Sequence, residues 1–146
     1  MKISRSKREC AFTLAEIVIS TALGSITIGA SIYGYVLAAK RAEWSGYSLA
    51  ANSLAMQGVE QARACKWDPN AAVPIDQLVS SNFPMRVNIL DIPITGTNIV
   101  YATNFTTISV VQTNPPLKMI RVDTLWMFMS DGPYTNTVVT YRAPDT

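Results

Sequence analysis

The pattern of apolar and polar positions divides the chain into a helical part and a strand-forming part. Residues 12–39, "FTLAEIVISTALGSITIGASIYGYVLAA", form an apolar run in which Glu16 is the only charged residue. The run exceeds the roughly 20 residues that a membrane-spanning helix needs. Residues 40–68 continue with apolar residues at three-to-five spacing, which indicates an amphipathic helix. The pattern therefore predicts one helix from about Phe12 to about Lys66, ended by the breaker sequence "DPN" at 68–70.

The pattern changes to period two after residue 69, which indicates strands. We expect strands at 86–92, 97–102 and 104–112, and a hairpin of 117–129 with 134–142 across the turn "SDGP". The clearest alternation places Ile120, Val122, Trp126 and Phe128 on one face. An apolar sheet face needs a cover, and the helical stripe from Trp44 to Ala62 can supply it. The predicted fold is α+β, with a long N-terminal helix packed on a small antiparallel sheet of about four strands.

Composition narrows the possible functions. The chain has 146 residues, of which 49% are hydrophobic and 15% charged, and its net charge is +2. This balance does not suggest a nucleic-acid partner. The chain has no histidine and two cysteines, Cys10 and Cys65, and no nucleophile–base pair or phosphate-binding loop stands out. We therefore expect no enzyme activity, no cofactor and no metal site.

The first residues carry the most specific pattern. A short polar stretch contains the basic residues Lys2, Arg5, Lys7 and Arg8. A basic flank before an apolar helix predicts a cytoplasmic N-terminus. Next come the small residue Ala11, then "FTLAE" at 12–16, and then the apolar helix.

This arrangement resembles the N-terminus of type IV pilins and of type II secretion pseudopilins. The resemblance implies that prepilin peptidase cuts between Ala11 and Phe12, that the helix is retained, and that the new amine of Phe12 is N-methylated. The chain departs from the family pattern in having alanine where glycine is usual and in having no proline within the apolar helix. The implied organisation is a leader at 1–11, a transmembrane and assembly helix at 12–39, its amphipathic continuation at 40–68, and a β-sheet head at 69–146.

Glu16 needs a partner if its helix lies in a membrane. A charged side chain there costs at least about 2.5 kcal/mol on insertion scales. The resemblance implies that its carboxylate pairs, within a filament, with the Phe12 amine of a neighbouring subunit. Because Glu16 lies near the start of the helix, its carboxylate could instead reach water at the membrane surface.

The expected function is that of a structural subunit of a type II secretion pseudopilus or a type IV pilus-like filament, and within that class of a minor pseudopilin. Its partners would be prepilin peptidase, other pilin or pseudopilin subunits, assembly platform proteins and inner-membrane lipid. The expected location is the inner membrane, with a periplasmic head, followed by the filament. The alternative is a single-pass inner-membrane protein that presents a small periplasmic binding domain and keeps its leader.

Overall fold

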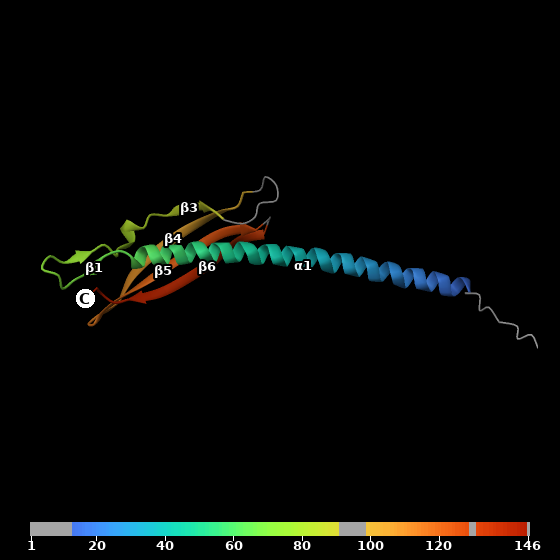
Figure 1. The fold of residues 1–146 in the computed structure, drawn as a ribbon, viewed down its shortest axis with the longest axis horizontal. Coiled ribbons are helices and arrows are strands. Elements are labelled where there is room, and N and C mark those ends of the chain that lie inside the picture. Colours follow the sequence, from blue (N-terminus) through green and yellow to red (C-terminus); the bar gives the residue numbers. More distant parts are fainter. Residues whose placement is uncertain (1–12, 91–98, 129–130, 146) are drawn as a thin grey trace, which may run out of the picture. The chain divides into compact units, whose positions relative to one another are not determined.

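The computed structural model describes residues 13–90, 99–128 and 131–145. It has an α+β fold, in which one long N-terminal helix is followed by two antiparallel sheets (Figure 1). The chain divides into two compact units, Met1–Arg41 and Ala42–Thr146, and the border between them falls inside the helix. Among the described residues, the first unit contributes the N-terminal part of the helix, whereas the second holds the packed core.

The helix α1 spans Leu14–Arg63 as a single element, as the sequence predicted. It ends three residues before the predicted Lys66, at a point where the last carbonyls of a helix need partners from outside it. The guanidinium of Arg142 supplies them by donating hydrogen bonds to the carbonyl oxygens of Ala62 and Cys65. A cation at this end also interacts favourably with the helix dipole.

The larger sheet has four antiparallel strands in chain order, β3-β4-β5-β6. The strands span Arg86–Ile89 (β3), Tyr101–Thr113 (β4), Pro116–Phe128 (β5) and Asp131–Arg142 (β6). The predicted hairpin of the last two strands is confirmed, and β6 begins at Asp131, inside the predicted turn. The predicted strand at 86–92 is shorter in the structure, and residues 91 and 92 lie outside the described part of the chain.

The predicted separation of the strands 97–102 and 104–112 was wrong, because β4 continues through Thr103 and Asn104. Asn104 lies opposite Thr124 of β5, and its side-chain oxygen accepts a hydrogen bond of 2.8 Å from the Thr124 hydroxyl. A residue with a low strand propensity is thus held in the ladder by a cross-strand contact. The two predicted strands at 97–102 and 104–112 are therefore one strand, which starts at Tyr101.

The second unit buries its core between the C-terminal part of α1 and one face of the larger sheet. Four small helical residues, Ala51, Ala55, Val59 and Ala62, are buried there. On the sheet side, Ile120, Val122, Trp126 and Phe128 are buried, as their alternation predicted. Small residues let the helix approach the sheet closely: a Cβ added at Gly58 would lie 3.1 Å from Val122. The predicted helical cover of the sheet is confirmed.

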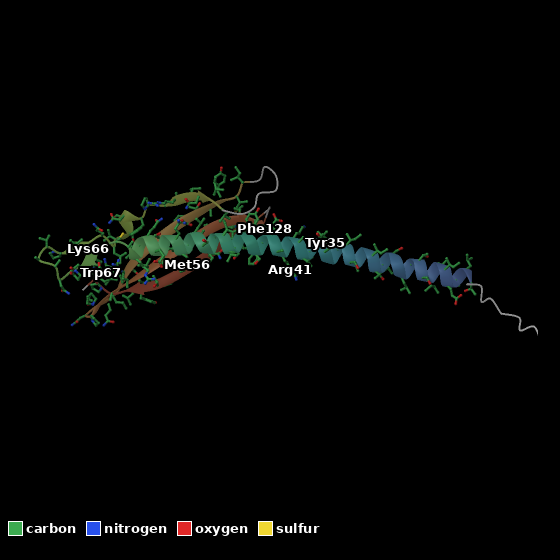
Figure 2. The ribbon with its side chains drawn as sticks, viewed as in Figure 1. Tyr35, Arg41, Met56, Lys66, Trp67 and Phe128 are labelled. Carbon is green, nitrogen blue, oxygen red and sulfur yellow. The ribbon has the colours of Figure 1, made fainter. Side chains whose placement is uncertain are left out.

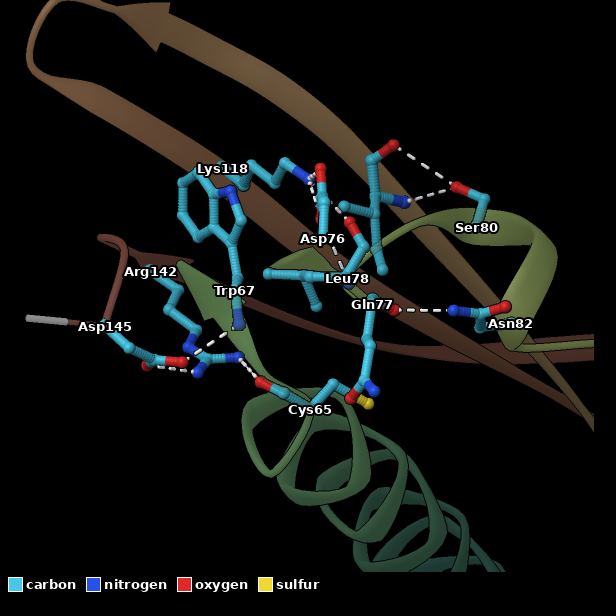
Figure 3. A network of polar contacts seen from close by, with 11 residues as sticks. Cys65, Trp67, Asp76, Gln77, Leu78, Ser80, Asn82, Lys118, Arg142 and Asp145 are labelled. Carbon is cyan, nitrogen blue, oxygen red and sulfur yellow. Dashed lines mark hydrogen bonds and ion pairs between the residues drawn. The ribbon is translucent and has the colours of Figure 1, made fainter. Parts of the chain in front are cut away.

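A small sheet that the sequence did not predict follows the helix. Its strands are β1 (Trp67–Asp68) and β2 (Ile75–Asp76), and a 3-10 turn, η1 (Ser80–Asn82), leads on to β3. Polar contacts fix this region to the larger sheet (Figure 3). The ammonium of Lys118, on β5, binds both carboxylate oxygens of Asp76 and the Leu78 carbonyl, and lies 4.8 Å from the centre of the Trp67 ring.

The C-terminal residues close the same network. The carboxylate of Asp145 accepts hydrogen bonds from the backbone N–H of Trp67, at 2.9 Å, and from the Arg142 guanidinium, at 2.6 Å. These two contacts, the backbone bond first, lower the pKa of Asp145 from its usual value. One arginine therefore links the end of α1 to the last residues of the chain (Figure 3).

Candidate assembly site on the N-terminal helix

The part of α1 that lies in the first unit, up to Arg41, presents apolar side chains on all sides. Figure 2 shows side chains projecting on both sides of this part of the helix. The exposed large apolar residues include Leu14, Ile17, Val18, Ile19, Leu23, Ile26, Ile28 and Ile32. A helix that is apolar all round is stable only when protein or lipid surrounds it. Among the described residues, α1 is one helix that is long and apolar enough to cross a membrane.

Four hydroxyl groups of this segment have partners within the helix itself. Thr21, Ser25, Thr27 and Ser31 each donate to a backbone carbonyl three or four residues earlier, at distances of 2.7–3.0 Å. In a bilayer an unsatisfied polar group costs several kcal/mol, so internal bonding is what an apolar surrounding requires. These four residues therefore do not oppose insertion of the helix into lipid.

Glu16 lies in the first turn of α1 and forms a capping box with Thr13. Its Oε2 atom accepts two hydrogen bonds from Thr13, one of 2.8 Å from the backbone N–H and one of 2.9 Å from the hydroxyl. In return, the Thr13 hydroxyl oxygen accepts a bond of 3.3 Å from the Glu16 backbone N–H. The carboxylate thus satisfies open donors at the start of the helix.

The capping box holds the carboxylate in place but does not neutralise it. Both bonds go to Oε2, and both side chains are exposed. The positive end of the helix dipole further favours an anion at this position. The Glu16 carboxylate is therefore a negative charge held in place at the N-terminal end of an apolar helix. It can bind a cation that another molecule supplies.

The other predicted site residues, Ala11 and Phe12, lie outside the described residues. The proposed cut would leave the capping box intact, because the N–H of Thr13 belongs to the peptide bond with Phe12. That bond is retained when the chain is cut before Phe12. The local contacts of Glu16 are therefore compatible with both the precursor and the processed chain.

Sequence reasoning missed Thr13 as the partner of Glu16. The signal was present, because a threonine followed three residues later by glutamate at the start of a helix is the capping-box pattern. Searched over 13–90, 99–128 and 131–145, the chain has no cluster of three or more His, Cys, Asp or Glu that could hold a metal ion. No protein-family model, curated protein or solved structure matches the chain.

Proposed function

We propose that this protein is a pilin-like structural subunit. Its leader, residues 1–11, would be removed by prepilin peptidase, and its apolar helix would carry it first in the inner membrane and then in a pseudopilus or pilus-like filament. The observation that carries the proposal is an apolar helix, exposed all round, that begins with a fixed carboxylate directly after a cleavage-like sequence.

The exposed surface of α1 supports this role. Residues 14–39 have apolar surface far beyond what a dissolved helix leaves open, and lipid and the helices of other subunits are the two surroundings that can cover it. The same segment can therefore serve a subunit that leaves the membrane and enters a bundle of like helices. In this proposal the N-terminus is cytoplasmic and the residues from Ala42 onward are periplasmic.

Glu16 gives the proposed assembly its register. The carboxylate would pair with the methylated amine of Phe12 in a neighbouring subunit, because methylation leaves that amine cationic. A pair formed between apolar helices is poorly screened and is lost at a large cost when one partner is removed. The secretion pseudopilus and a minor position within it remain part of the proposal.

The capping box allows the charge of Glu16 to be tested apart from its hydrogen bonds. Glu16→Gln keeps an oxygen that can accept the bonds from Thr13 but removes the charge. Thr13→Ala keeps the charge but removes the hydroxyl, which should cost the helix about 1 kcal/mol. Thr21→Ala is a matched control, because it removes a hydroxyl from the same helix without touching the capping box.

Each variant would be expressed in the native host, and its amount would be compared in membrane and sheared-filament fractions. We expect Glu16→Gln to insert normally and to fall at least about tenfold in the filament fraction, because the pair is worth more than 1.4 kcal/mol. Thr13→Ala and Thr21→Ala should stay near wild type. Normal assembly of Glu16→Gln would refute the charge pairing, and absence of the wild-type chain from filaments would refute the function.

A further inference from the structure

The larger sheet has a second face that no described residue covers. Its rows follow from the register: Val87, Thr103, Leu125 and Thr135 form one row across the four strands, and Phe105, Asp123 and Thr137 form the next. The buried residues of the same strands, such as Val122 and Trp126, alternate with these and point toward α1. We call this second face the outer face.

The outer face carries a large patch of exposed apolar side chains. Seven large apolar side chains on it are 38–59% exposed: Val87, Ile89, Tyr101, Phe105, Met127, Val139 and Tyr141. Aromatic side chains present about 150–250 Å² each and the aliphatic ones less, so the seven together leave roughly 600 Å² of apolar surface in water. This is at the upper end of the roughly 300–600 Å² that the largest patch on a typical monomer reaches, and such patches are often functional. The area approaches the roughly 800 Å² that one partner contributes to a standard interface.

The residue types also match those of an interface. Aromatic residues, methionine and arginine are enriched where proteins bind each other, and lysine and glutamate are depleted. The outer face carries Tyr101, Phe105, Tyr141 and Met127, and its one arginine is Arg121 among the residues that the structure describes. Lysine and glutamate are absent from the rows just described.

The charges on the outer face form one pair near its middle. Arg121 Nε lies 2.8 Å from Asp123 Oδ2, and the Thr137 hydroxyl donates to the same carboxylate. Burial raises the pKa of Asp123, but the bonds from Thr137 and Arg121 outweigh it and hold this pKa below its usual value. Asp123 is therefore ionised at neutral pH, and the two charges cancel.

We propose that the outer face binds the outer face of a second copy of this chain. The apolar residues lie on both sides of the central ion pair, with Tyr101 and Phe105 toward one end and Val139 and Tyr141 toward the other. A two-fold axis through the middle would place Arg121 of each copy against Asp123 of the other. The contact is then self-complementary in charge, as a two-fold interface must be, and the two sheets stack as in a sandwich.

This inference goes beyond the proposed function and does not depend on it, because it concerns the second unit alone. It is tested in the full-length chain in membranes, with Cys10→Ser and Cys65→Ser as background. Thr107 lies on the outer face opposite Arg121. Because stacked sheets lie about 10 Å apart, too far for a direct disulfide, Thr107→Cys should be joined to Thr107→Cys of a second copy by a bismaleimide crosslinker about 10 Å long. Asn52→Cys, which is exposed on α1, is the matched control and should remain monomeric.

Charge reversal makes the test specific for a second copy. Arg121→Glu and Asp123→Lys, each combined with Thr107→Cys, bring like charges together and should lower the crosslinked dimer about tenfold or more. Co-expression of the two reversed chains should restore the dimer, which a merely unfolded variant could not do. Three outcomes would each overturn the proposal: Thr107→Cys remains monomeric, it crosslinks only to a different protein, or co-expression of the two reversed chains does not restore the crosslinked dimer.

Discussion

Lys118 and Asp76 form a pair whose two members should differ in their importance for stability. The Lys118 side chain is 7% exposed and that of Asp76 is 45% exposed, with 2.6 Å between nitrogen and oxygen. Removal of the buried partner leaves a carboxylate that water can solvate. Removal of the exposed partner leaves a buried ammonium without a counter-charge, which lowers the free energy of unfolding more.

The magnitudes follow from this asymmetry. Asp76→Asn keeps an Oδ1 acceptor for the backbone N–H of Leu78 but leaves the Lys118 ammonium without a counter-charge. Loss of one partner of a fully buried pair costs about 3–5 kcal/mol, and the partial exposure of Asp76 reduces our expectation to about 2 kcal/mol. Lys118→Met loses the bond to the Leu78 carbonyl but buries no charge, so we expect about 1 kcal/mol or less.

The test is urea unfolding of the full-length chain in detergent micelles, followed by tryptophan fluorescence. Trp67 packs against the ammonium and reports on this region directly. With a slope of about 2 kcal/mol per molar urea, Asp76→Asn should lower the midpoint by about 1 M. The double variant Asp76→Asn with Lys118→Met should be more stable than Asp76→Asn alone. A larger loss for Lys118→Met, or no recovery in the double variant, would refute the reasoning.

Two other contacts give predictions of the same kind. Asn136→Ala removes the acceptor, at 2.7 Å, of the buried Trp126 N–H and should cost about 1–3 kcal/mol in urea unfolding; Asn52→Ala, an exposed amide on α1, should leave the midpoint within error of wild type. The pKa of Asp145 is lower in the folded state than in the unfolded state, where it is about 4. The ionised carboxylate therefore stabilises the fold above about pH 4, and this stabilisation is lost as the pH falls through the folded-state pKa. Asp145→Asn should therefore flatten the loss of stability on acidification, and an unchanged acid profile would show that the bonds from Trp67 and Arg142 to this carboxylate do not contribute.

The sequence predicted the elements whose residues repeat and missed the contacts that join distant segments. The alternation of β5 identified Ile120 and Trp126 as core, and the helical stripe identified the cover. The same alternation also places Lys118 on the buried face. From sequence alone a lysine is expected to be exposed, because its burial requires a partner, here Asp76. That partner lies 42 residues away, so only the fold brings the two together.

Local chemistry was misjudged in two ways. The sequence divides β4 into two predicted strands next to Asn104 because asparagine favours turns, but a cross-strand hydrogen bond from Thr124 outweighs that preference. The strands β1 and β2 have two residues each, too few for any period to appear. At the candidate site, Glu16 stands out as the one charged residue of the apolar run. Its contact with Thr13 follows from the three-residue spacing of a capping box, which the prediction from sequence did not include.

Processing of the N-terminus is the central claim, because the assembly role of Glu16 requires a free amine on Phe12. The most direct measurement is the mass and N-terminal sequence of the chain purified from its native host. We predict a chain that starts at Phe12 and is one methyl group heavier than its sequence, and a block of this processing by Ala11→Glu but not by Ser6→Glu. A chain that keeps residues 1–11, or that starts at another residue, would contradict the account.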